Sequence, residues 1–315
     1  MTWKKYFDSD KEYASSPLPP LAQSFDRHDG EVYRSCDYVD LAVNIAMATG
    51  RPLLIRGPAG SGKSSLAPFV AKRLRWRFLR KVITSRTEIR DLLYTIDTVR
   101  RLNDAQAHEL KPDLANYIEP GVLWWAFNPT SARIRGTTGV LDPGCTQAKP
   151  PEGAAGEGPS VVLLDEIDKG EPDLPNSLLI PLGSLNFDVP EIGQSVKAER
   201  PPFVVITTND ERDLPAAFLR RCVLLELKHH STTVLAEIAE KHFGPDENGL
   251  YSTIAQIVVR SREDAERRGE RGASTAEYLD AVWACRALAI RPDETTDEWN
   301  VLSAVILRKA ALDSL

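Results

Sequence analysis

The chain has 315 residues, enough for two domains or for one large domain with an appendage, and enough to bury a substantial core. Apolar residues make up 42% of it, which excludes a disordered chain and indicates a globular one. The net charge of −6 disfavours a broad nucleic-acid-binding surface, so we expect no nucleic-acid partner, although a local basic patch would be compatible with this charge.

Three features bear on where the protein resides. No apolar run reaches the roughly 20 residues that a membrane span needs, so we expect no membrane span. The first eight residues lack the apolar core of a signal peptide. The four cysteines, Cys36, Cys145, Cys222 and Cys285, lie far apart and form no metal-like pair. We therefore expect reduced thiols and a cytoplasmic protein.

The N-terminal part of the chain precedes any strong structural pattern. Residues 1–35 contain prolines and mixed charges with weak periodicity, and we interpret them as an N-terminal extension. Apolar side chains at helical spacing in residues 38–49, followed by Gly50, predict a short helix that ends at the glycine. An α/β core of residues 36–230 is expected to begin here.

A glycine-rich segment, Arg56–Ser65, is the most informative stretch because it fits the pattern G-x-x-x-x-G-K-[ST]. The apolar run Pro52–Ile55 precedes it and a helical pattern follows, so strand, loop and helix stand in the order of a phosphate cradle. Glycines let the backbone wrap around a phosphate chain, and the helix N-terminus favours negative charge. The candidate nucleotide-binding residues are Gly57, Pro58, Ala59, Gly60, Ser61, Gly62, Lys63, Ser64 and Ser65.

Two of these residues have more specific expected roles. Lys63 is placed to meet the β- and γ-phosphates of a nucleotide, and Ser64 is placed to offer its hydroxyl to Mg²⁺.

Downstream, strand character over Phe78–Thr84 is followed by a helical stretch around Ile89 and Leu92. Residues 95–160 are irregular and are expected to form an inserted loop, with an aromatic run at 119–127 and a Pro/Gly-rich stretch at 146–160.

The second chemical motif is a pair of carboxylates at the end of a buried strand. Val161–Leu164 is a continuous apolar run, and Asp165 and Glu166 follow it. Successive side chains of a strand point in opposite directions, so we expect the two acids to do different work. Asp165 would hold Mg²⁺, and Glu166 would act as general base on the attacking water. The plainer alternative is a strand that ends in solvated acids.

Two further polar segments follow buried apolar runs. Val204–Ile206 leads into Thr208 and Asn209, and Asn209 is expected to orient water or to touch the γ-phosphate with Thr208 beside it. These residues could also be ordinary turn formers. Arg220 and Arg221 precede a last strand, Val223–Leu225. An arginine that reaches a neighbouring subunit's γ-phosphate would stabilise the transition state, with Arg221 the better candidate, whereas cations at a helix C-terminus are also stabilising by themselves.

After residue 230 the pattern becomes entirely helical. Four amphipathic segments, around Leu235, Ile254, Val282 and Val305, predict an all-helical domain over residues 231–315. Strands separated by helices before that point predict a parallel sheet with helices on both sides, so the fold class is α/β.

The order of these parts resembles that of AAA+ ATPases and, within them, the MoxR-type branch. The residues that carry the resemblance are Arg51–Gly60, Asp165–Lys169, Leu174–Leu179, Leu214–Cys222, Val82–Thr87 and Asp91–Tyr94. The resemblance implies a P-loop NTPase sheet of order 5-1-4-3-2 flanked by helices, followed by a helical lid. It also implies a ring, usually a hexamer, that binds ATP and Mg²⁺ between subunits and remodels a protein client, often with a von Willebrand factor A domain partner.

The resemblance also sets expectations for the less regular segments. It places inserted loops at residues 119–127 and 186–199, the second as a hairpin with its turn at Gly193. Trp124 and Trp125 could instead be packed against the sheet. Many relatives carry a γ-phosphate-touching arginine where this chain has Ala276, and Arg271 or Arg286 could substitute. Tyr33 and Tyr38 are candidates for stacking on adenine, although both could be structural.

Three functions from different classes are compatible with the residues. The leading hypothesis is a MoxR-type ATPase that hydrolyses ATP at the subunit interfaces of a ring and does conformational work on a client. A nucleic-acid-associated AAA+ motor or restriction-type GTPase is the first alternative, and the acidic balance argues against it. A small-molecule kinase with a phosphate loop is the second, and the adjacent carboxylates with the helical tail disfavour it.

Overall fold

The computed structural model describes residues 33–137, 147–153, 158–246 and 248–308. Most of the expected N-terminal extension and Cys145 lie outside these residues. The chain forms two compact units. One is the α/β unit, Ser35–Gly57 together with Lys63–Leu227. The other is the helical unit, which contains the chain from Lys228 onward, the loop Pro58–Gly62 and, before the α/β unit, Tyr33 and Arg34.

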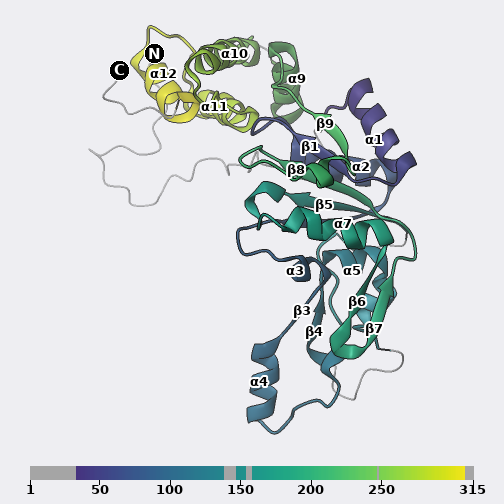
Figure 1. The fold of residues 1–315 in the computed structure, drawn as a ribbon. Coiled ribbons are helices and arrows are strands. Elements are labelled where there is room, and N and C mark those ends of the chain that lie inside the picture. The colour runs from purple at the N-terminus through teal and green to yellow at the C-terminus, as the bar shows by residue number, and fades with distance from the viewer. Residues whose placement is uncertain (1–32, 138–146, 154–157, 247, 309–315) are drawn as a thin grey trace. The chain divides into compact units, whose positions relative to one another are not determined.

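The α/β unit is built on one five-stranded parallel sheet (Figure 1). Its strands are β1 (Leu53–Arg56), β2 (Arg77–Val82), β5 (Ser160–Asp165), β8 (Phe203–Thr208) and β9 (Val223–Glu226). They lie in the order β2-β5-β8-β1-β9, which is the predicted order 5-1-4-3-2 when only these five strands are counted along the chain. The predicted fold class is therefore confirmed. The carboxyl ends of β5 and β8, which carry the polar motifs, lie side by side.

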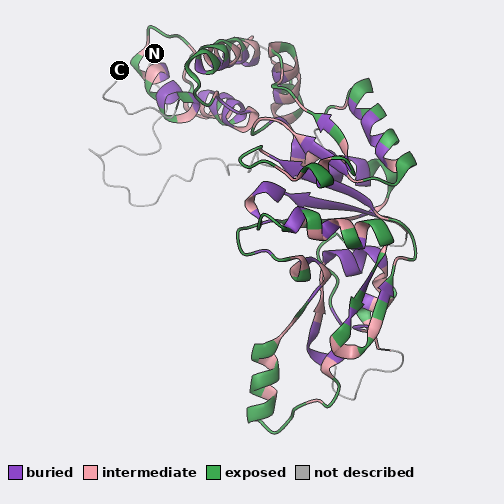
Figure 2. Ribbon diagram, viewed as in Figure 1, coloured by how far each residue is buried: buried purple, intermediate pink, exposed green. Residues whose placement is uncertain are grey.

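Both faces of the sheet are covered, as the purple strands in Figure 2 show. On one face Leu54, Val162 and Ile206 share a core with α5 (Val122–Phe127) and α7 (Leu174–Ser184). Residues in alternate positions, such as Leu163, are equally inaccessible, and α2 (Lys63–Leu74) contacts β2, β5 and β8. This double burial explains why the strands are continuous apolar runs rather than alternating ones.

The helix before the phosphate loop ends where the sequence predicts. Helix α1 (Asp37–Thr49) stops at Gly50, which adopts a left-handed conformation with φ of 65°. The Gly50 N–H donates to the carbonyl groups of Ala46 and Met47. Glycine takes this conformation without the steric cost that other residues bear, so the chain can turn directly into β1.

The stretch that the sequence predicts to be an inserted loop, residues 95–160, is largely regular structure in its described part. A short antiparallel pair, β3 (Tyr94–Ile96) and β4 (Ile118–Pro120), carries α4 (Thr98–Gln106) and the 3-10 turn η1 (Leu114–Tyr117) between its strands. Helices α5 and α6 (Pro129–Arg133) follow. All six residues of α5 are buried, so it has no polar face and no helical periodicity by which to be recognised. Trp124 and Trp125 therefore pack in the core, as the alternative interpretation held.

The second predicted insertion is a hairpin, as expected. Strands β6 (Asn186–Val189) and β7 (Gln194–Lys197) pair antiparallel, with η3 (Pro190–Ile192) and Gly193 at the turn. Gly193 has φ of 62°, which accounts for a glycine at this position. Three short helices complete the α/β unit: α3 (Ile89–Leu93), η2 (Ile167–Lys169) and α8 (Ala216–Leu219).

The helical unit contains the four predicted helical segments. They are α9 (Thr232–Phe243), α10 (Leu250–Arg268), α11 (Thr275–Leu288) and α12 (Asp297–Leu302), the last continued by the π-helical turn η4 (Ser303–Arg308). Leu235, Ile254, Val282 and Trp299 meet in its core. A capping box formed by Ser274 and Glu277 opens α11, with both reciprocal hydrogen bonds present. Among the described residues, no helix has both the length and the apolar character to cross a membrane.

Candidate functional site

The glycine loop has the backbone that phosphate binding requires. Gly57, Gly60 and Gly62 all have positive φ, of 146°, 73° and 88°. A Cβ on Gly60 would lie 2.7 Å from the Cβ of Ser274, so this glycine is also required by close packing. Ser61 is 2% exposed, and its buried hydroxyl has no hydrogen-bond partner. An unsatisfied donor of this kind in a glycine loop is suited to a phosphate oxygen.

Lys63 begins α2 directly after the loop and is almost fully buried. Its Nζ donates to the carbonyl oxygen of Gly57 at 2.6 Å. Burial lowers the pKa of Lys63, while the negative charges of Asp165 and Asp168 act in the opposite direction. The next two residues, Ser64 and Ser65, lie half-buried on the first turn of the helix.

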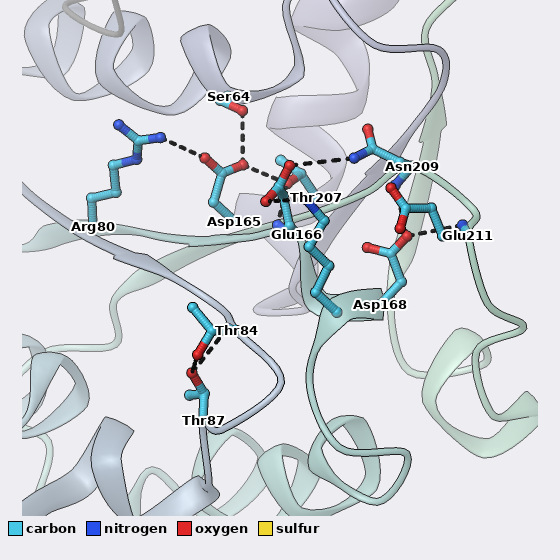
Figure 3. Close-up of polar contacts among 11 residues, drawn as sticks. Ser64, Arg80, Thr84, Thr87, Asp165, Glu166, Asp168, Thr207, Asn209 and Glu211 are labelled. Carbon is cyan, nitrogen blue, oxygen red and sulfur yellow. Dashed lines mark hydrogen bonds and ion pairs between the residues drawn. The ribbon is translucent and has the colours of Figure 1, made fainter. Parts of the chain in front are cut away.

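Asp165 is the most fully satisfied carboxylate of the site (Figure 3). Its Oδ1 accepts hydrogen bonds from the hydroxyls of Ser64, at 2.7 Å, and Thr207, at 2.6 Å. Its Oδ2 accepts one from Arg80 of β2 at 2.8 Å. Burial alone would raise the pKa of Asp165, but the hydrogen bonds from Thr207, Ser64 and Arg80 outweigh burial and keep the pKa below its ordinary value. The carboxylate is therefore held ionised beside the Ser64 hydroxyl.

Glu166 diverges from Asp165 for a reason other than the predicted strand alternation. The strand ends at Asp165, and Glu166 adopts a left-handed conformation with φ of 62° and ψ of 53°. This rare backbone state is held because the Glu166 N–H donates to the Thr207 hydroxyl at 2.9 Å. The side chain accepts from Lys169 Nζ at 2.9 Å and, in a longer contact, from Asn209 Nδ2 at 3.4 Å.

The polar residues at the end of β8, Thr207 and Thr208, and Asn209 directly after it lie near the carboxylates of β5. Asn209 lies against Glu166, as Figure 3 shows. Thr207, which the sequence interpretation passed over, is the residue that joins Asp165 and Glu166. The predicted Thr208 is fully buried, and its hydroxyl accepts from the backbone N–H of Asp210. Thr208 therefore contributes a hydrogen bond to the turn after β8.

Arg220 and Arg221 follow α8 and precede β9, and both are exposed. No carboxylate in the described part of the chain is in contact with either side chain. Among the described residues, neither side chain makes an ion pair, although the Arg220 carbonyl accepts from Arg51 at 3.5 Å. Two exposed cations adjacent to an edge strand remain available to a group outside the described chain.

Within the helical unit, the two arginines considered as substitutes for Ala276 differ in their surroundings. Arg286 donates to the Phe243 carbonyl at 2.7 Å and to the Tyr251 hydroxyl, so it is used in packing. Arg271 is more than half exposed and borders a cavity of about 310 Å³. The residues around that cavity are Pro58, Ala59, His229, Arg262, Glu266, Glu270, Arg271 and Gly272.

The two tyrosines considered for adenine stacking also separate. The Tyr33 ring lies 3.2 Å from the position that a Cβ on Gly62 would occupy, so it is close to the loop. Tyr38 lies on α1 in the other unit and is 59% exposed. Of the pair, Tyr33 is thus the one whose surroundings include the phosphate loop.

The donor set fits a phosphate chain with Mg²⁺. The Ser64 hydroxyl and the Asp165 carboxylate are oxygen ligands, which Mg²⁺ prefers, and Mg²⁺ commonly takes only one or two protein ligands beside phosphates and water. Among the described residues there is no group of three or more His, Cys, Asp or Glu side chains that could hold a metal by themselves.

Comparison with known proteins identifies the family. The model of AAA domains of the dynein-related subfamily matches residues 52–222, which is slightly more than half of the chain. The chain belongs to this family. This AAA domain matches no curated protein. Among solved structures it is similar to a candidate ATPase from Cytophaga hutchinsonii, with 14% identity, a TM-score of 0.41, and coverage of 85% of this chain and 79% of that chain.

Some residues of the AAA site were not identified from the sequence. Arg80, Asp168 and Thr207 all contact the predicted residues, yet each lies within a strand or turn without a distinctive pattern. Arg80 is one of three cations on β2, with Arg77 and Lys81, so its charge alone does not single it out. The contacts depend on which strands are neighbours, and β2 and β8 flank β5.

Proposed function

We propose that this AAA domain is a MoxR-type ATPase that hydrolyses ATP between the subunits of a ring and uses the energy to remodel a protein client. The observation that carries the proposal is the contrast between one organised cluster, Ser64–Asp165–Glu166–Asn209, and an exposed Arg221 without an ion-pair partner among the described residues. The cluster can hold metal and activate water. Arg80 and Lys169 are paired with the carboxylates of Asp165 and Glu166, so in this proposal Arg221 of an adjacent subunit joins Lys63 in stabilising the transferred phosphoryl group.

The residues have separate roles in this proposal. The loop and Lys63 hold the phosphates, and Ser64 with Asp165 would hold Mg²⁺, which neutralises phosphate charge when bound. Glu166 accepts a proton from the attacking water, and Asn209 orients that water. Arg221 of an adjacent subunit, assisted by Arg220, meets the charge that develops on the γ-phosphate, for which a planar and permanently charged guanidinium is suited.

The central test is complementation between two inactive variants of the full chain. Glu166→Gln removes the general base and keeps Arg221. Arg221→Ala removes the arginine that would reach the adjacent subunit's nucleotide and keeps the general base. If sites are shared, an equal mixture regains activity, because about a quarter of the interfaces in a randomly mixed ring combine an intact base with an intact Arg221. Malachite-green measurement of phosphate release provides the readout. A mixture that stays as inactive as its components contradicts the shared site.

The same preparation tests the alternatives. Turnover per chain that rises steeply with protein concentration favours a shared site, whereas concentration-independent turnover favours a small-molecule kinase. Filter binding with DNA or RNA across a salt titration tests the nucleic-acid motor, because such binding weakens steeply with salt. Parallel assays with ATP and GTP test the restriction-type GTPase.

A client-remodelling role has its own experiment. A protein with a von Willebrand factor A domain encoded beside this chain is the expected partner, and co-purification in the presence of a non-hydrolysable ATP analogue tests the association. The Glu166→Gln variant, which is expected to retain nucleotide, is the preferred bait. A partner that binds equally well to the Lys63→Ala variant contradicts nucleotide-dependent engagement.

A further inference from the structure

A buried carboxylate holds the turn that carries Asn209. Asp168 lies in η2, is 3% exposed, and uses one oxygen, Oδ2, for two hydrogen bonds. The donors are the backbone N–H groups of Asn209, at 3.1 Å, and Glu211, at 3.0 Å (Figure 3). Its other oxygen, Oδ1, is buried and has no hydrogen-bond partner.

This arrangement is costly for the fold, and its location suggests why it persists. A buried ionised carboxylate that leaves one oxygen unsatisfied loses solvation without full compensation. The two N–H groups flank Asp210, which has a left-handed backbone with φ of 59°. An sp² oxygen has two lone-pair sites, so a single oxygen can accept from both N–H groups and hold both sides of this unfavourable turn. The backbone of this turn sets the direction in which the Asn209 side chain leaves the chain.

We propose that Asp168 is a positioning residue that acts through the backbone to hold the Asn209 amide beside the Glu166 carboxylate. The inference rests on the proposed ATPase function, because the placement matters only if Asn209 and Glu166 act on the same water. Asp168 acts through its contacts with the main chain of the turn, whereas the side chains of Asn209 and Glu166 contact each other at 3.4 Å.

The alternative role is purely electrostatic, since the charge of Asp168 also influences Lys63. The two roles separate because both N–H groups bind the same oxygen. An amide oxygen in Asp168→Asn can accept both, and its NH₂ takes the place of the unpartnered Oδ1. That variant removes the charge and preserves the two hydrogen bonds from Asn209 and Glu211 to residue 168, which we call the clamp. Asp168→Ala removes both the charge and the clamp.

The experiment compares ATP turnover in the two variants, with the exposed neighbour Asp213→Ala as matched control. We expect Asp168→Ala to lower kcat by about 10- to 100-fold with KM for ATP nearly unchanged, since small misplacements of a catalytic group have effects of this size. Asp168→Asn should stay within about threefold of the wild type. In the Asp168→Ala background, adding Asn209→Ala should cost almost nothing further, because the amide is already misplaced.

A second readout is independent of activity. Hydrogen exchange of the peptide spanning residues 208–213 should accelerate in Asp168→Ala and remain slow in Asp168→Asn, with exchange in the sheet unchanged. Equal loss of turnover in both variants, or slow exchange in Asp168→Ala, overturns the clamp. Full turnover in Asp168→Ala while Glu166→Gln is inactive overturns the clamp and leaves the proposed function standing. Full turnover in Glu166→Gln contradicts the proposed function, and exchange then decides the clamp by itself.

Discussion

Two arginines of the helical unit, Arg262 and Arg286, are used in the opposite way to Arg221 of the α/β unit. In the helical unit Arg262 is buried, and it donates to the carbonyl groups of Ala273 and His230 at 2.6 and 3.2 Å. Arg286 likewise serves the Phe243 carbonyl and the Tyr251 hydroxyl. In the α/β unit, Arg221 is exposed next to a strand. Donors committed to carbonyl groups of the same chain are not free for a ligand, so hydrogen bonding, rather than exposure alone, separates these arginines from one that is available to a second molecule.

The largest expected effect tests whether the exposed Arg221 acts on a second molecule. Arg221→Ala should lower kcat for ATP by about 10³-fold, because a trans-acting arginine is commonly worth this much in phosphoryl transfer. Thermal unfolding should be unchanged, since the side chain is exposed. Steady-state phosphate release measures the first quantity and differential scanning fluorimetry the second. Arg220→Ala is the adjacent control, and a larger loss in that variant would transfer the assignment to Arg220.

The next largest effect tests whether the buried Arg262 stabilises the helical unit. Arg262→Met keeps the apolar stem but removes the donors to two carbonyl groups, so the helical unit should lose about 2–4 kcal/mol. Denaturant titration with hydrogen exchange of α10 and α11 measures this loss. Arg260→Met, an exposed change on the same helix, should cost less than about 0.5 kcal/mol. Equal stability of the two variants would show that the buried hydrogen bonds contribute nothing.

Arg286 provides a sharper distinction because it was a candidate for contact with the γ-phosphate. Its guanidinium lies over the rings of Phe243 and Tyr251, with distances of 5.7 and 5.9 Å to the ring centroids. Arg286→Ala should therefore destabilise the helical unit by about 1–2 kcal/mol through lost hydrogen bonds and cation–π contacts. At temperatures where the variant is folded, kcat should be unchanged. A loss of turnover without a loss of stability would return Arg286 to the nucleotide site.

The smallest expected effect concerns pH. Burial, followed by the charges of Arg262 and His229, lowers the pKa of His230 from 6.5 to about 4. Between these values the unfolded chain binds a proton that the folded chain does not, so stability falls as pH drops from 6.5 towards 4. After allowance for residual exposure, the loss is about 1 kcal/mol. Comparing chemical denaturation of wild type and His230→Gln at pH 7.5 and pH 5 measures it, and an identical pH dependence would contradict the assignment.

The sequence predicts the nucleotide motifs well because each combines a local chain pattern with a local structure. Lys63 begins its helix and Asp165 ends its strand as the pattern requires. Helix α5 was not predictable in the same way, because a helix buried on every side has no polar face and therefore no helical period. Strand alternation predicted that Glu166 and Asp165 would point in different directions. The strand ends before Glu166, however, and the left-handed backbone of Glu166, which donates its N–H to the Thr207 hydroxyl of β8, sets its direction instead.

The amino-acid order alone determined the phosphate loop, the buried runs of the sheet and the four helical segments, since these depend on residue type and spacing within a few neighbours. Tertiary structure decided which residues from distant parts of the chain contact one another at the site. The placement of β2 and β8 on either side of β5 brings Arg80 and Thr207 onto Asp165 from 85 and 42 residues away. Contacts between strand ends follow sheet order, and sheet order reflects the packing of the whole unit rather than any local pattern.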